Sequence, residues 1–227
     1  MLIHLKHVLG AKELAQIQTI LANVKFIDGK SSAGSVAAKV KNNQEVSSDE
    51  AALNDLNNLV MGNLVRNKLY QRAALPVKIA SPFYSRYQQG MKYGDHIDDP
   101  VMGNSFDSHQ RYRSDLAITV FLNDPEQYEG GELCIQTDFG QQIIKYPAGD
   151  AVMYPATTRH CVNEVTSGER LVAVTWVQSM IKDNEKRALL YQLGTAREKL
   201  LRKQPTEDYS KQVDLVYVNL VRKWSEV

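Results

Sequence analysis

A series of short runs rich in Val, Ile, Tyr and Thr lies between about residue 76 and residue 180, separated by Gly, Asn, Asp and Pro. Such runs are typical of β-strands, and the residues between them are typical of turns. No segment with helical periodicity separates the runs, which disfavours a parallel sheet of strand–helix–strand units. The pattern predicts an antiparallel sandwich or barrel. The clearest predicted strands are 83–87, 116–122, 132–137, 141–146, 151–154, 161–166 and 171–178.

Helical periodicity precedes this strand region. A first helix is predicted over 11–24, and its apolar stripe is Leu14, Ile17, Ile20 and Leu21. Ser47 and Glu50 have the spacing of a capping box and predict the start of a second helix. The apolar stripe of that helix is Leu53, Leu56, Leu59, Val60 and Leu64.

Helical periodicity also follows the strand region, over 189–201 and again over 213–224, with a break at Pro205. The apolar faces of these two helices are expected to pack on the sheet or on a neighbouring subunit, so a homo-oligomer formed through the terminal helices is one expectation. The sequence thus predicts an N-terminal helical region over 1–75, a strand core over 76–180 and a C-terminal helical region over 181–227.

Charge and composition narrow the classes of partner. The 27 Lys and Arg residues nearly balance the 26 Asp and Glu residues, and no basic block stands out, so nucleic acid is not an expected partner. The longest apolar run, 171–177, is too short to span a bilayer, and the first ten residues lack the apolar stretch of a secretory signal. Cys134 and Cys161 have neither metal-type nor redox-type spacing and are expected to be reduced core thiols. A cytoplasmic location without a membrane partner is the expectation.

His96 and Asp98 form the most distinctive local pattern, where a predicted strand ends. Residues two apart on an extended chain point to the same side, so an imidazole and a carboxylate can face one ion. His160 begins a later strand, which a jelly roll can bring back to this pair. Two histidines and one carboxylate with open positions are typical of non-haem iron(II) oxygenases. The alternatives are an acidic turn exposed to solvent and a hydrogen-bonded core histidine.

Arg170 stands at the head of the apolar strand 171–178. A guanidinium group cannot lose its proton, so burial requires an anionic partner or a route to water. A dicarboxylate supplies such a partner through two parallel N–H bonds. The alternative is an exposed arginine beside the turn at 167–168, with its stem packed on the sheet.

The order His96, Asp98, His160 and Arg170 resembles that of the iron(II)- and 2-oxoglutarate-dependent dioxygenases. A closer resemblance covers essentially the whole chain and is to bacterial PKHD-type hydroxylases, relatives of the prolyl 4-hydroxylases. The stretches that carry it are SSAGSVAAKVKNNQEV, RYQQGMKYGDHID, SDLAITVFLND, EGGELCI and YPAGDAVMYPATTRHCVNEVTSGERLVAVTWV.

The resemblance implies an α+β protein with a double-stranded β-helix core, jelly-roll and cupin-like, flanked by N-terminal and C-terminal helices. It implies that His96, Asp98 and His160 are the catalytic iron(II) ligands and that Arg170 binds 2-oxoglutarate. Tyr87 matches a position where prolyl hydroxylases carry a tyrosine bonded to the co-substrate; the alternative is an aromatic side chain filling the interior. L-ascorbate is a candidate reductant.

The implied reaction uses 2-oxoglutarate and dioxygen to hydroxylate an unactivated C–H bond of a peptide or small metabolite, releasing succinate and CO2. Two alternatives stay open: a cupin-type metalloenzyme that does not use 2-oxoglutarate, and a non-catalytic jelly-roll binding module. The segments 31–43 and 100–113 are expected to face the substrate. Their basic side chains would favour an acidic substrate unless they are ordinary solvated charges; these are Lys39, Lys41, Arg111 and Arg113.

Overall fold

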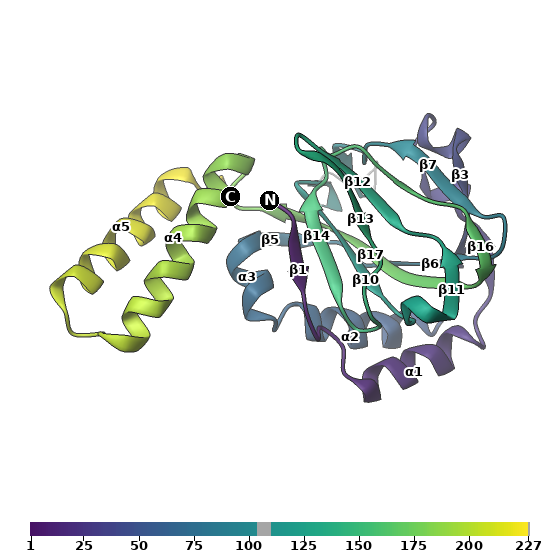
Figure 1. Ribbon diagram of the computed structural model, residues 1–227, viewed down its shortest axis with the longest axis horizontal. Helices are drawn as coiled ribbons and strands as arrows, with labels where there is room; N and C mark the ends of the chain where they lie inside the picture. Colours follow the sequence, from purple (N-terminus) through teal and green to yellow (C-terminus); the bar gives the residue numbers. More distant parts are fainter. Residues whose placement is uncertain (104–109, 227) are drawn as a thin grey trace.

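The computed structural model describes residues 1–103 and 110–226, and two antiparallel sheets form its centre (Figure 1). The larger sheet has eight strands. In spatial order seven of them are β1 (Ile3–Leu5), β14 (Ala151–Pro155), β10 (Leu116–Phe121), β17 (Arg170–Ser179), β6 (Phe83–Tyr87), β4 (Gln44–Val46) and β2 (Phe26–Asp28). The eighth, β5 (Pro76–Ile79), also pairs with β17.

The smaller sheet has five strands and faces the larger one across a shared apolar interior. Its order is β13 (Gly140–Ile144), β12 (Leu133–Thr137), β15 (His160–Val162), β7 (Lys92–His96) and β3 (Lys41–Asn42). Two further antiparallel pairs join β11 (Tyr128–Gly130) to β16 (Val165–Gly168) and β8 (Val101–Met102) to β9 (Tyr112–Arg113). The predicted antiparallel architecture is confirmed.

The observed strands follow the predicted ones closely, except over 161–166. That segment divides into two strands, because Val162 pairs with the smaller sheet whereas Val165 pairs with β11. Cys134 and Cys161, both free, lie directly opposite each other on β12 and β15. Cys134 is buried, as expected of a core thiol, whereas Cys161 is only partly buried.

The N-terminal region is only partly helical, so the prediction for residues 1–75 is wrong in part. It contains α1 (Ala11–Leu21), α2 (Leu53–Leu64) and α3 (Lys68–Ala74), but it also supplies β1 to β4 to the two sheets. These strands are two or three residues long, too short to show alternation. The predicted capping box is also wrong, because the Glu50 carboxylate accepts a hydrogen bond from the backbone N–H of Lys25, at 2.8 Å, and α2 begins only at Leu53.

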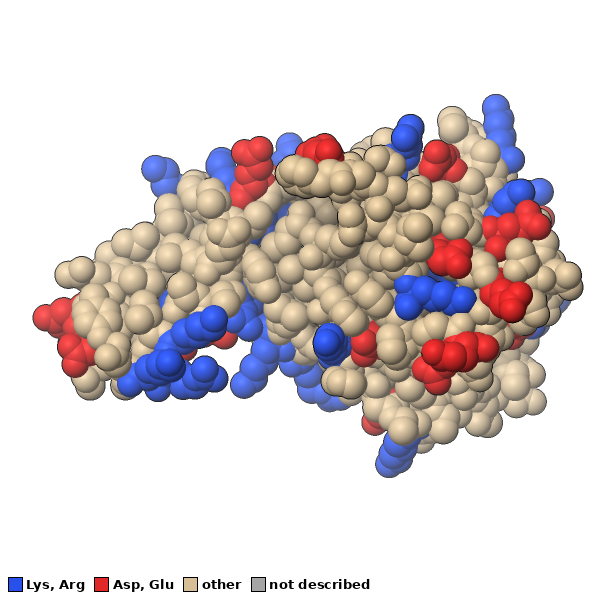
Figure 2. All heavy atoms as spheres, viewed as in Figure 1, with Lys and Arg blue, Asp and Glu red and all other residues tan. Residues whose placement is uncertain are grey.

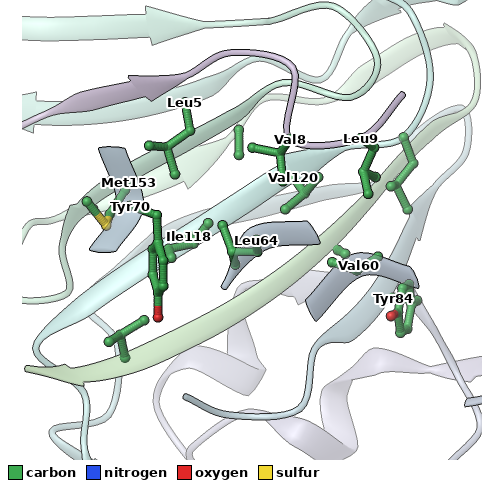
Figure 3. Close-up of a cluster of buried hydrophobic side chains, with 14 of the residues drawn as sticks. Leu5, Val8, Leu9, Val60, Leu64, Tyr70, Tyr84, Ile118, Val120 and Met153 are labelled. Atoms are coloured by element: carbon green, nitrogen blue, oxygen red, sulfur yellow. The ribbon is translucent and has the colours of Figure 1, made fainter. Parts of the chain in front are cut away.

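The main core lies between these helices and the outer face of the larger sheet. Leu56, Val60 and Leu64 of α2 have no exposed surface, and Figure 3 shows Val60 and Leu64 directed toward the strand residues Ile118 and Val120. Burying one such side chain contributes about 1.5–3 kcal/mol. Because helices cover this face, the opposite face of the sheet is left to form the interior with the smaller sheet.

The C-terminal helices α4 (Asn184–Lys203) and α5 (Asp208–Trp224) form a hairpin that projects from the rest of the molecule (Figure 1). They pack on each other and α4 also contacts α3, so the expectation that they cover the sheet is wrong. Leu189, Leu215 and Val216 on the hairpin are about half exposed or more. Self-association through this hairpin stays a prediction.

Charged side chains are unevenly distributed on the face drawn in Figure 2. Lys and Arg gather along the lower side of the helical hairpin, whereas both signs are interspersed over the strands.

Within residues 1–103 and 110–226, no helix combines the length and the apolar character that crossing a bilayer requires. The cytoplasmic location stays a prediction.

Candidate metal centre and co-substrate site

His96, Asp98 and His160 come together at the wall of a cavity of about 840 Å³ between the two sheets. His96 ends β7, Asp98 follows two residues later, and His160 begins β15 directly opposite His96. One ligand atom from each of the three side chains lies within 4.8 Å of the other two. Strand pairing therefore fixes this cluster.

Both histidine rings are oriented by the backbone. The Nδ1 atom of His96 lies 2.8 Å from the carbonyl oxygen of Gly94, and that of His160 lies 2.9 Å from the carbonyl oxygen of Thr158. A carbonyl oxygen only accepts, so Nδ1–H donates in each ring and Nε2 keeps a free lone pair. The Tyr93 ring stacks on His96 with centroids 3.7 Å apart. These contacts are typical of those that orient metal-binding histidines.

Burial determines the charges of the cluster. It lowers the pKa of His96 to about 4, with the nearby His160 acting in the same direction, so the His96 ring is neutral at neutral pH. Burial raises the pKa of Asp98, against the opposing influence of His160 and Trp176. Asp98 Oδ1 lies 3.8 Å from His160 Nε2, beyond hydrogen-bond distance, and within residues 1–103 and 110–226 the buried Asp98 Oδ2 atom has no hydrogen-bond partner. A divalent ion fits this donor set and would stabilise the carboxylate.

Arg170 lies at the inner end of the same cavity and is only 1% exposed. Among the described residues no carboxylate pairs with it, and its Nε and Nη1 atoms are buried without partners. Its guanidinium carbon lies 5.0 Å from the centroid of the Tyr87 ring and 5.9 Å from that of Phe121. A buried cation among aromatic rings requires an anion, and the carboxylate of a small ligand fits this place.

Tyr87 is the register partner of Arg170, on β6 next to β17. Its side chain is buried and lines the cavity. Burial raises the pKa of Tyr87 to about 12, although Arg170 acts in the opposite direction. The phenol is therefore protonated at neutral pH and can donate a hydrogen bond to an anion held by Arg170.

Gly131 makes room for the Arg170 side chain. Its φ is +65°, and a Cβ atom at this position would lie 3.1 Å from Cδ of Arg170 and 2.9 Å from Cγ2 of Val165. A Cβ atom at Gly130, whose φ is +71°, would lie 2.0 Å from the carbonyl oxygen of Glu164. The missing side chain at Gly131 thus leaves the space that the arginine side chain occupies.

A buried ion pair from the N-terminal region forms another wall of the cavity, and the sequence did not reveal it. The Lys41 ammonium lies 2.6 Å from a carboxylate oxygen of Glu45 and 2.7 Å from the hydroxyl of Ser32, and it lies over the Tyr93 ring. Lys41 is thus neither a solvated charge nor available to an acidic substrate. Arg113 is likewise paired, with Asp115 at 2.6 Å.

The two segments expected to face the substrate both reach the cavity. Ser32 and Ala37 line it from the first, and Val101 and Tyr112 line it from the second. Residues 104–109 of the second segment lie outside the described residues.

Sequence comparison relates the chain to a known family. Residues 82–178 match the model of the 2OG-Fe(II) oxygenase superfamily. A PKHD-type hydroxylase of Thioalkalivibrio sulfidiphilus is 45% identical over 227 residues, which covers 100% of both chains. A PKHD-type hydroxylase of Escherichia fergusonii is 38% identical, again with 100% of both chains covered.

Structural comparison finds the same fold in prolyl hydroxylases. A Pseudomonas putida prolyl-4-hydroxylase superposes with a TM-score of 0.52 at 16% identity, covering 78% of this chain and 92% of that one. A Trichoplax adhaerens prolyl hydroxylase in complex with a hypoxia inducible factor oxygen degradation domain peptide fragment gives a TM-score of 0.56 at 15% identity, covering 83% of this chain and 86% of that one. The predicted jelly-roll core with flanking helices is confirmed.

Proposed function

The chain belongs to the PKHD-type hydroxylases of the 2OG-Fe(II) oxygenase superfamily, and we propose that it hydroxylates an unactivated C–H bond of a peptide or small metabolite. It is an enzyme that uses iron(II), 2-oxoglutarate and dioxygen. The observation that carries the proposal is one cavity that joins the His96, Asp98 and His160 cluster to the buried guanidinium of Arg170, with which no carboxylate of the described residues pairs.

In this proposal His96 and His160 bind iron(II) through Nε2, and Asp98 binds it through one carboxylate oxygen. These residues would hold iron(II), which together with 2-oxoglutarate would supply the dioxygen activation that converts substrate C–H to C–OH and 2-oxoglutarate to succinate and CO2. The backbone carbonyls of Gly94 and Thr158 hold the two imidazole rings in the tautomer that the metal needs.

Arg170 and Tyr87 are the proposed co-substrate contacts. The guanidinium of Arg170 would hold the distal carboxylate of 2-oxoglutarate, and the phenol of Tyr87 would donate a second hydrogen bond. The apolar interior around them excludes water, which strengthens the ionic contact. A cupin-type enzyme without 2-oxoglutarate would leave the Arg170 charge buried without an anion, so this alternative is disfavoured.

The substrate and any need for L-ascorbate stay predictions. We expect purified enzyme loaded with iron(II) and 2-oxoglutarate, incubated with fractionated cell extract under isotopically labelled dioxygen, to place one labelled oxygen atom in succinate. The other should appear in a hydroxylated product found by mass spectrometry. Label in neither molecule, although 2-oxoglutarate is consumed, would contradict the proposal. Arg170→Gln is the matched variant that should consume little 2-oxoglutarate.

A further inference from the structure

Three buried side chains form a row across neighbouring strands at the inner end of the cavity. Tyr87 on β6 lies directly opposite Arg170 on β17. On the other side of β6, the strand β4 pairs Gln44 with Arg86. The same register, continued by one residue, places Asn43 opposite Tyr87. Because directly opposed residues of an antiparallel pair project from the same face of the sheet, the order along the row is Asn43, Tyr87 and Arg170.

Asn43 brings a buried amide to this row. It is 3% exposed, and it lines the cavity together with Tyr87 and Arg170. Within residues 1–103 and 110–226, neither the nitrogen nor the oxygen of the Asn43 amide makes a hydrogen bond of ordinary geometry. Asn43 also lies outside residues 82–178, the part of the chain that matches the superfamily model. A buried amide without a partner is unfavourable, which indicates that its hydrogen bond is completed when a ligand orders the row.

Gly29 determines which end of the Asn43 amide faces the phenol of Tyr87. The backbone N–H of Gly29 donates to the carbonyl oxygen of Asn43, at 3.0 Å. A Cβ atom at Gly29 would overlap Oδ1 of Asn43 but would lie 3.3 Å from Nδ2, so Oδ1 is the end that packs on this glycine. Burial raises the pKa of Tyr87, and Asn43 opposes this rise, as an N–H donor to the phenol oxygen does. Both observations indicate that Nδ2–H of Asn43 faces the phenol.

We propose that Asn43 is a positioning residue for 2-oxoglutarate: its Nδ2–H donates to the phenol oxygen of Tyr87, so that the phenol O–H is donated to the carboxylate held by Arg170. This inference rests on the proposed function, because Tyr87 and Arg170 are the co-substrate contacts proposed there. A phenol carries a single hydrogen, and an oxygen that already accepts from Asn43 keeps this hydrogen for the ligand. Two hydrogen bonds in series also strengthen each other in an interior that excludes water.

Titration of full-length enzyme loaded with iron(II), without oxygen, measures the Kd of 2-oxoglutarate through the visible charge-transfer band. Asn43→Ala should raise this Kd roughly fivefold, as the loss of one hydrogen bond predicts, and should leave iron(II) binding unchanged. Asn42→Ala is the matched control, because Asn42 is an exposed neighbour whose amide donates to the carbonyl oxygen of Gly90, and its Kd should equal that of the unmodified protein. An unchanged Kd in Asn43→Ala, or an equal rise in Asn42→Ala, would overturn the inference.

A double-variant cycle with Tyr87→Phe separates positioning from support of the fold. Tyr87→Phe should raise the Kd of 2-oxoglutarate at least as much as Asn43→Ala does, and combining the two should raise it less than about twofold further. Effects that multiply would show that Asn43 acts independently of the phenol and would refute its positioning role. Asn43→Asp keeps the side-chain volume but loses the N–H donor, so it replaces Asn43→Ala if that variant does not fold. Its Kd should rise at least as much, and an unchanged Kd would refute the role as well.

2-Oxopentanoate, which has the keto-acid group of 2-oxoglutarate but not its distal carboxylate, tests where the effect of Asn43 acts. Because the row contacts the distal carboxylate, Asn43→Ala and unmodified protein should bind 2-oxopentanoate with the same Kd. Equal weakening of both ligands would contradict the inference. Absence of the band from unmodified protein with 2-oxoglutarate refutes the proposed function, whereas a normal band with a Kd that Asn43→Ala leaves unchanged refutes only the role of Asn43.

Discussion

His96 and His160 lie directly opposite each other on β7 and β15, with ring centroids 4.3 Å apart. Antiparallel pairing places side chains of opposed residues on the same face of a sheet, so the ladder itself brings the two imidazoles together. The Tyr93 ring stacks on the His96 ring, and Nδ1 of each imidazole hydrogen-bonds a backbone carbonyl oxygen. These contacts orient the two imidazole rings. The metal centre is therefore expected to form without large rearrangement.

Replacing Arg170 with Gln should weaken binding of 2-oxoglutarate while iron(II) binding is kept. Loss of one partner of a buried charge pair costs about 2 kcal/mol or more, which raises the Kd on the order of 30-fold. Isothermal titration with each ligand separately measures both effects. Arg86→Gln is the control, because Arg86 hydrogen-bonds Gln44 and does not line the cavity. An equal loss of iron and 2-oxoglutarate binding would contradict the assignment of Arg170.

Replacing Gly131 with Ala should displace Arg170 and weaken 2-oxoglutarate binding. The new Cβ atom would meet Arg170 and Val165 at about 3 Å, and the left-handed backbone adds about 1 kcal/mol of strain. Gly90→Ala is the matched control, since Gly90 also has positive φ but has open space around it. Thermal melts should show a loss of stability in both variants. Titration with 2-oxoglutarate should show weaker binding only in Gly131→Ala.

Replacing only one residue of the Lys41–Glu45 ion pair should lower the free energy of unfolding more than replacing both residues. Glu45→Ala leaves the Lys41 charge buried alone, for which we expect a loss of about 3–5 kcal/mol in the free energy of unfolding. The double variant Lys41→Met, Glu45→Met should recover much of this loss. Urea denaturation of the single and double variants measures the coupling. Additive losses would mean that the two side chains do not interact.

Stability should fall as the pH rises above 10. Burial raises the pKa of Tyr70 and Tyr84 well above the ordinary value of 10. The unfolded chain therefore releases these protons before the folded protein does, so stability is fully present below pH 10 and declines above it. Urea midpoints measured between neutral and alkaline pH should follow this decline.

Tyr70→Phe tests the contribution of one buried phenol. The buried Tyr70 hydroxyl has no hydrogen-bond partner in the part of the chain that the structure describes, so its removal should change stability at neutral pH by less than about 1 kcal/mol and should reduce the alkaline decline. Tyr84→Phe should reduce the decline too, but it loses a hydrogen bond to Asn57, worth about 1 kcal/mol at every pH. An unchanged alkaline slope in both variants would contradict the role of buried phenols.

The sequence predicted most of the strand core because its longer strands, such as β10, β12 and β17, show their residue pattern. His96, Asp98, His160 and Arg170 were placed in one motif by their residue types and their order along the chain. The Lys41–Glu45 wall was not predictable, because its strands are two or three residues long and their pairing is decided by tertiary contacts. The direction of the C-terminal hairpin was not predictable either. The amphipathic pattern of α4 and α5 shows that each helix buries one face. It does not show whether that face packs on the sheet or, as observed, on the other helix of the hairpin and on α3.

Anaerobic titration of the purified protein with iron(II) and 2-oxoglutarate is the most direct test of the metal centre and its co-substrate. The account predicts the weak visible charge-transfer band of the chelate in unmodified protein and in Cys161→Ser, whose side chain neighbours His160 in sequence but does not line the cavity. It predicts no band in folded Asp98→Ala or His160→Ala. A band that survives both of these substitutions, or its absence from folded unmodified protein, would contradict the account.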